Sequence, residues 1–200
     1  MCFTDMEKIA VYGGSFDPPH IGHKALSLNL AKACGADKII IVPTALSPFK
    51  KSSGASAQDR LQMCKIFFKE DIFEVSDIEI NRGGKSYTVD TLRSIKEKYP
   101  DSQLFLFMGD DMLLSFDRWY NYKEILELSK IVCACRNVTL DKLSLMKDYV
   151  KSILKTDVII CEDVPVEVSS TEIRGDITGK GKEFLHGDVY EYIIQRGLYI

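Results

Sequence analysis

A glycine- and proline-rich turn between a short apolar strand and an amphipathic helix constrains this chain more than any other stretch. The turn, residues 13–23, reads Gly-Gly-Ser-Phe-Asp-Pro-Pro-His-Ile-Gly-His and follows the strand expected at residues 8–12. Gly13 and Gly14 let the main chain approach a ligand closely, because no side chain stands in the way. The helix expected at residues 21–34 begins here with free amide donors and the positive end of its dipole. The stretch therefore predicts a site for an anion such as phosphate.

His20 and His23 stand three residues apart at the start of that helix, a spacing that places both imidazoles on one side. We interpret them as groups that face a reacting phosphorus. They could instead be metal ligands completed by carboxylates, or ordinary structural histidines. The third histidine of the chain, His186, is distant in sequence, so we expect no protein-held metal.

Composition predicts a soluble globular protein with a single domain over residues 1–200. Hydrophobic residues make up 46% and charged residues 28% of the chain, and its formal net charge of -3 predicts neither nucleic-acid nor membrane binding. The six cysteines form no Cys-x-x-Cys pair and fall mostly in apolar runs, which favours reduced thiols in a reducing compartment. Because no signal peptide or transmembrane segment is visible, we expect a cytoplasmic protein. A homo-oligomer is compatible with the sequence, which does not fix the oligomeric state.

Apolar runs alternate with helical patterns along the whole chain. Strands are expected at residues 38–43, 104–108, 131–135 and 157–161, and a more exposed strand at 73–80. Helical spacing of apolar residues separates them, and Thr88 is a candidate cap for one helix. The pattern predicts a three-layer α/β/α, Rossmann-like domain with a mostly parallel sheet, whose ligand crevice lies at the carboxyl ends of the strands.

A second informative stretch, Ser169-Ser170-Thr171-Glu172-Ile173-Arg174, lies near the other end of the chain. Three hydroxyl side chains precede the start of a short helix, and Arg174 follows one turn later. One interpretation is a plain helix cap with a solvated arginine. The other is that the hydroxyls, the free amides and the guanidinium together hold a triphosphate. The glycine and histidine turn favours the second interpretation.

The two stretches together resemble the nucleotidyltransferase superfamily that shares His-x-Gly-His with class I aminoacyl-tRNA synthetases. Within it, the chain is similar to the bacterial nicotinate-nucleotide adenylyltransferases along nearly its whole length. The similarity also rests on Ser86-Tyr87-Thr88-Val89-Asp90-Thr91-Leu92, on Gly109-Asp110-Asp111 and on Trp119-Tyr120.

This resemblance implies transfer of AMP from ATP to nicotinate mononucleotide, with Mg²⁺ carried mainly by ATP. His20, His23 and Arg174 would be the catalytic residues. The ATP site would comprise Gly13, Gly14, Ser15, Phe16, Asp111, Ser169, Ser170, Thr171 and Arg174. Asp111 would contact a ribose, and the nicotinate pocket would comprise Thr88, Trp119 and Tyr120, with Lys50 near a phosphate.

Two loops depart from the family pattern. Ser47-Pro48-Phe49-Lys50 stands where the family often has Pro-Pro-His-Lys, and Arg136-Asn137-Val138 replaces its Arg-Pro-Gly. The alternative functions are adenylyl transfer to nicotinamide mononucleotide or phosphopantetheine, and a non-catalytic nucleotide-binding regulator. An RNA-binding synthetase fragment is disfavoured by the acidic charge balance.

Overall fold

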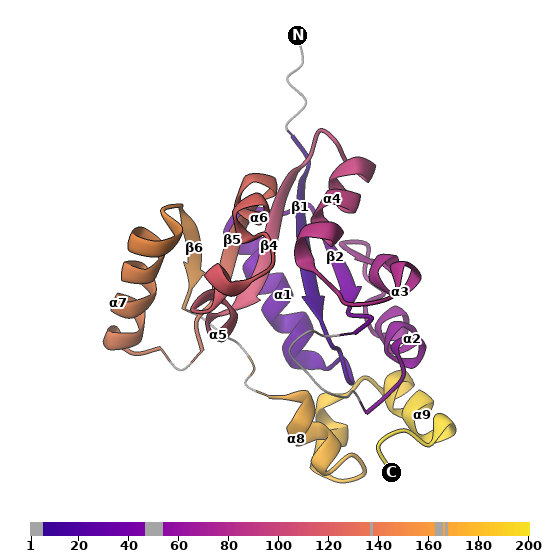
Figure 1. The fold of residues 1–200 in the computed structure, drawn as a ribbon. Coiled ribbons are helices and arrows are strands. Elements are labelled where there is room, and N and C mark those ends of the chain that lie inside the picture. The colour runs from indigo at the N-terminus through magenta and orange to yellow at the C-terminus, as the bar shows by residue number, and fades with distance from the viewer. Residues whose placement is uncertain (1–5, 47–53, 137, 163–165, 167) are drawn as a thin grey trace.

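One parallel sheet organises the chain in the computed structural model, which describes residues 6–46, 54–136, 138–162, 166 and 168–200 (Figure 1). Each pair of neighbouring strands is parallel, and the strand order is β3-β2-β1-β4-β5-β6. The strands are β1 (Lys8–Gly14), β2 (Lys38–Pro43), β3 (Phe73–Val75), β4 (Gln103–Gly109), β5 (Ser129–Ala134) and β6 (Val158–Cys161). The expected α/β fold with a parallel sheet is confirmed.

Helices cover both faces of the sheet, because successive strand residues point in opposite directions. Ala10 and Tyr12 pack into one core with α1 (Ile21–Cys34), α2 (Ala57–Phe67), α8 (Ser170–Gly175) and α9 (Gly187–Arg196). Ile9 and Val11 pack into the other with α4 (Thr88–Lys98), α6 (Tyr122–Leu128) and α7 (Leu140–Tyr149). Short helical segments complete the described chain: α3 (Ile78–Arg82), α5 (Asp110–Leu113), η1 (Phe116–Arg118), η2 (Val150–Leu154) and η3 (Lys180–Phe184).

The prediction of a strand at residues 73–80 is wrong in its second half. The strand β3 ends at Val75, and the chain then forms α3. Alternating side chains favoured a strand, but the carboxylate of Glu79 turns inward and accepts a hydrogen bond from Thr91 Oγ1 in α4 at 2.6 Å. Tyr87 rather than Thr88 occupies the cap position of α4, and Thr88 is its first helical residue.

The order of the strands creates a crevice between the carboxyl ends of β1 and β4. From β1 the chain winds outward to β2 and β3, then returns to place β4 on the other side of β1. Sheets of this kind bind their ligands where the winding direction reverses. Figure 1 shows α8 and α9 beside this end of the sheet, far from the N-terminus.

Close packing of η3 against α8 generates a prediction about stability. A methyl group added at Gly181 would lie 2.6 Å from the carbonyl oxygens of both Ile173 and Asp176. We expect Gly181→Ala to lower the free energy of unfolding by about 1–3 kcal/mol, because backbone atoms cannot move aside cheaply. Gly187→Ala is the matched control, since nothing lies within 4 Å of the added atom at the start of α9. Urea unfolding followed by circular dichroism measures both, and equal stabilities would contradict the packing argument.

Candidate functional site

Two segments from opposite ends of the chain line one cavity of about 220 Å³. The early turn contributes Ser15, Asp17, His20 and His23, and the late segment contributes Val168, Ser169, Ser170, Thr171 and Arg174. Ser170 Oγ donates a hydrogen bond to the carbonyl oxygen of Pro18 at 3.1 Å, and Arg174 Nη1 donates to that of Asp17 at 2.6 Å. Thr44, Ala45, Leu46, Arg60 and Arg136 complete the wall. The structure thus brings both predicted phosphate-binding stretches into one cradle.

The two imidazoles lie against each other at the start of α1, with ring centroids 3.7 Å apart. His20 is the cap residue of the helix, and its main-chain N–H donates to His23 Nδ1 at 3.2 Å. Because Nδ1 accepts, the proton of a neutral His23 ring resides on Nε2. In that state, the hydrogen-bond donor of the His23 ring is Nε2.

His20 is 3% exposed. The pKa of its imidazole is lowered from 6.5 to about 4, mainly by burial and also by the positive charge of Arg136, while the carboxylate of Glu172 acts in the opposite direction. His20 is consequently neutral at physiological pH and acts as a hydrogen-bonding group rather than a cation.

Asp17 is a buried anchor beneath the turn rather than a group free to act on a ligand. Its carboxylate accepts hydrogen bonds from the main-chain N–H groups of Gly54 at 2.7 Å and Ala55 at 3.1 Å, and from Tyr199 Oη at 2.6 Å. Burial and this carboxylate raise the pKa of Tyr199, so its phenol stays a donor. No local pattern in the sequence predicts the contact with Tyr199, because this phenol lies 182 residues further along the chain.

Arg60, which is 2% exposed, joins the ends of β1 and β2. Its Nη1 donates to the carbonyl oxygen of Ser15 at 2.7 Å, and its Nη2 donates to that of Thr44 at 2.6 Å. Sequence reasoning missed this residue, because an arginine in an amphipathic helix ordinarily points toward solvent.

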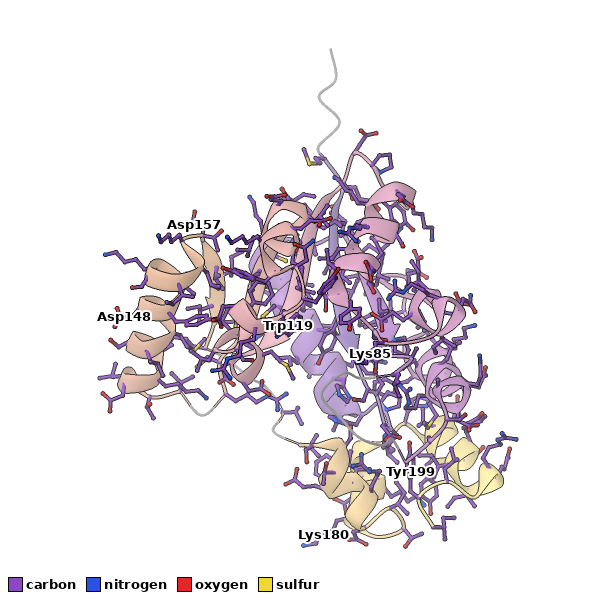
Figure 2. All side chains as sticks on the ribbon, in the orientation of Figure 1. Lys85, Trp119, Asp148, Asp157, Lys180 and Tyr199 are labelled. Atoms are coloured by element: carbon purple, nitrogen blue, oxygen red, sulfur yellow. The ribbon has the colours of Figure 1, made fainter. Side chains whose placement is uncertain are left out.

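A second cavity of about 240 Å³ adjoins the first at the carboxyl ends of β1 and β4. Ser15 and Thr44 line both cavities, which therefore meet at these two residues. Most of the second wall is apolar, and it includes Gly13, Gly14, Thr88, Met108, Gly109 and Trp119. Figure 2 labels Trp119 near the centre of the molecule. Thr88 and Trp119 also border a third, more superficial hollow with Tyr120, whose exposed ring has its centroid 4.8 Å from that of Tyr87.

Two further residues predicted for the substrate sites, Phe16 and Asp111, line neither of the two cavities described above. Phe16 lies in the core, with its ring edge against Tyr12, so it supports the turn from below. Asp111 is exposed, and its Oδ1 lies over Gly109, where an added methyl group would meet it at 2.7 Å. Lys50 falls outside the described residues.

The late helix has the helix cap expected from its sequence, and its residues also line the first cavity. Ser169 caps it, since its Oγ accepts from the Glu172 N–H at 3.2 Å while the carboxylate of Glu172 accepts from the Ser169 N–H at 2.8 Å. Thr171 Oγ1 accepts from Arg174 Nη2 at 3.3 Å. All three of these segment residues, Ser169, Thr171 and Arg174, also face the first cavity.

Asp110, the neighbour of Asp111, is a further buried group that sequence reasoning missed. Its carboxylate accepts from the main-chain N–H of Arg136 at 2.8 Å and pairs with Lys142. The pair fixes the start of the loop that carries the Arg136 guanidinium to the first cavity.

The described part of the chain contains no group of three or more His, Cys, Asp or Glu side chains that could hold a metal ion. No described helix has the length and apolar character needed to span a membrane. The five cysteines among the described residues are free thiols, and four of them are buried: Cys34, Cys64, Cys133 and Cys135.

The lowered pKa of His20 predicts a pH dependence of stability. Between pH 6.5 and 4 the unfolded chain binds a proton that the folded protein excludes, so stability falls as the pH is lowered. Between pH 7 and pH 5 the free energy of unfolding of the wild type should fall, and we expect His20→Gln to make this fall smaller by up to about 2 kcal/mol. Urea unfolding across this range measures it. Arg136→Gln should raise the pKa of His20 in an NMR titration, and identical pH slopes for wild type and His20→Gln would refute the assignment.

Comparison with known proteins agrees with the fold. The family model described as cytidylyltransferase-like matches residues 11–176. A protein of Aquifex aeolicus named "Probable nicotinate-nucleotide adenylyltransferase" is 41% identical over 165 residues, which cover 81% of this chain and 98% of that protein. One of the same name from Fusobacterium nucleatum is 39% identical and covers 90% of this chain and 91% of its own length.

Among solved structures, nicotinic acid mononucleotide adenylyltransferase of Plasmodium falciparum, complexed with NaAD, superimposes with a TM-score of 0.74. The match covers 96% of this chain and 97% of that one at 19% identity, and so demonstrates a shared fold. From the matches in sequence, this chain belongs to the nicotinate-nucleotide adenylyltransferases of the cytidylyltransferase-like family.

Proposed function

We propose that this protein transfers the adenylyl group of ATP to nicotinate mononucleotide, giving deamido-NAD and pyrophosphate in NAD biosynthesis. The observation that carries the proposal is the meeting of two unlike cavities at Ser15 and Thr44. One is lined by imidazoles, hydroxyls and arginines, and suits a polyphosphate. The other is mostly apolar, contains Trp119, and suits a flat heteroaromatic ring.

The reaction is an in-line displacement at the α-phosphorus of ATP. An oxygen of the 5′-phosphate of nicotinate mononucleotide forms the new P–O bond, and the bond to the bridging oxygen of pyrophosphate breaks. The attacking phosphate is already ionised, so the site needs no strong general base. Catalysis then consists of aligning two anions and stabilising the charge that they share.

The residues of the first cavity supply that stabilisation. Neutral His20 and the Nε2 of His23 donate hydrogen bonds to the α-phosphate and the leaving group, and Arg174 offsets the charge of the pyrophosphate. Ser169, Ser170 and Thr171 hold its oxygens beside the start of α8, and Gly13, Gly14 and Ser15 border ATP through the turn, whereas Phe16 is buried in the core and has no contact with the nucleotide. Asp111, at the end of β4, contacts a ribose.

The remaining assignments concern the acceptor and the metal. Thr88, Trp119 and Tyr120 enclose the nicotinate, and Lys50 meets a phosphate. Mg²⁺ enters as the complex with ATP, since it retains waters and prefers phosphate oxygens. Asp17 is the one carboxylate among the described residues of the first cavity, and three donors already occupy it. The buried free thiols fit a reducing compartment, so we assign the reaction to the cytoplasm.

Pyrophosphate release from ATP tests the function with three acceptors: nicotinate mononucleotide, nicotinamide mononucleotide and phosphopantetheine. We expect kcat/KM for the acid to exceed that for the amide by about 10- to 100-fold, because a charge-assisted hydrogen bond to the carboxylate is lost in the amide. Phosphopantetheine should give no release. A preference for either other acceptor would replace the proposed substrate, and no release with any of them would exclude catalysis.

His23→Ala tests the mechanism. We expect kcat to fall by about 10²–10³, because one donor to the developing charge is removed, with the Kd of ATP changed only a few-fold. His186→Ala is the control, since that histidine is exposed and caps α9 outside both cavities. Parallel losses in kcat and ATP binding would argue against a role in the transition state.

A further inference from the structure

One ionisable side chain in the second cavity has no part in the reaction described so far. Glu79, in α3, lines this cavity with Thr91 and Trp119 and is 5% exposed. Of the described residues on that wall, it alone carries a carboxylate. An acidic group needs explanation in a pocket whose proposed ligand is an anion.

The hydrogen bonding of Glu79 is one-sided. Its Oε1 accepts from Thr91 Oγ1 at 2.6 Å, whereas its Oε2 is buried and accepts from no described residue. Because an ionised oxygen is costly to bury without a partner, the charge requires compensation from elsewhere. Since Oε2 is shielded from solvent, Glu79 acts on a ligand through its charge rather than through a direct hydrogen bond.

The cations around Glu79 compensate its negative charge only in part. Arg82 Nη2 donates to Thr91 Oγ1 at 3.2 Å and so reaches Glu79 only through the hydroxyl. Arg60 interacts with Glu79 electrostatically, but both its Nη atoms donate to main-chain carbonyls. Within the described residues, no cation lies within 4.0 Å of the carboxylate to form an ion pair.

We infer that Glu79 selects the acceptor by the positive charge of its aromatic ring, an inference that rests on the proposed function. The ring nitrogen of a pyridine nucleotide is permanently cationic because it is bonded to ribose. A buried carboxylate on the wall of a mostly apolar cavity favours that cation over a neutral ring of the same shape. The nicotinate carboxylate is placed by Thr88, which lines the same cavity, and by the positive end of α4.

A pair of acceptors that differ in ring charge tests this inference. One is nicotinate mononucleotide, and the other is its C-nucleotide analogue, in which a neutral 3-carboxyphenyl ring bonded through carbon to C1′ of ribose 5′-phosphate replaces the pyridinium. Both keep the carboxylate and the attacking phosphate. At saturating ATP, we expect Glu79→Gln to reduce the preference for pyridinium, measured as the ratio of kcat/KM values, roughly tenfold. The change should lie mainly in the KM of the acceptor, with the KM of ATP unchanged.

Thr91→Ser is the matched control, because it alters the same wall of the cavity but keeps both the hydroxyl that donates to Glu79 and the charge, and it should leave the ratio unchanged. Equal loss of both acceptors in Glu79→Gln would overturn the inference and make Glu79 a purely structural residue. Should that variant fail to fold, wild type still decides, since a ratio within twofold of one excludes selection by charge. Absence of turnover with nicotinate mononucleotide in wild type would defeat the proposed function itself, and this inference with it.

Discussion

The site depends on the buried carboxylate of Asp17, which fixes the glycine-rich turn from three directions. Its donors belong to the segment that precedes α2 and to the last residues of the chain, and Arg174 binds the carbonyl oxygen of the same residue. Removal of one donor would leave a buried charge with fewer hydrogen bonds, so the whole set is strongly coupled. The first cavity is consequently shaped before any ligand arrives, which is the condition for electrostatic catalysis.

Charge and hydrogen bonding are divided between different residues around the first cavity. Arg60, Arg136 and Arg174 supply permanent positive charge, and the charge of Arg136 helps to hold the pKa of His20 near 4. The neutral His20 imidazole can therefore form a directional hydrogen bond with a ligand, and it adds no charge that changes with pH in the physiological range. Such a site attracts two anions across the physiological pH range, because guanidinium groups in proteins keep their positive charge there.

Local sequence revealed the parts of the site that consist of consecutive residues. The turn at residues 13–23 and the hydroxyl-rich start of α8 were visible because strand, turn and helix patterns place their side chains directly. The supporting residues Arg60, Glu79, Asp110 and Tyr199 were not, because each acts through partners brought close only by the sheet. The error at residues 73–80 has the same origin, since a contact with α4 overrode a local alternation.

Arg60 resolves an electrostatic difficulty at the junction of the two cavities. The main chain turns there at Ser15 and Thr44, and exposed carbonyl oxygens would repel phosphate groups. A single guanidinium donates to both carbonyl oxygens, at 2.7 Å and 2.6 Å, and its charge lies on the wall of the first cavity. The point where two anions must approach each other is therefore lined by a cation. The carbonyl oxygens there already accept hydrogen bonds from it, which weakens their repulsion of phosphate. The reversal of strand order between β1 and β4 opens the crevice, and this buried arginine makes it suitable for phosphate.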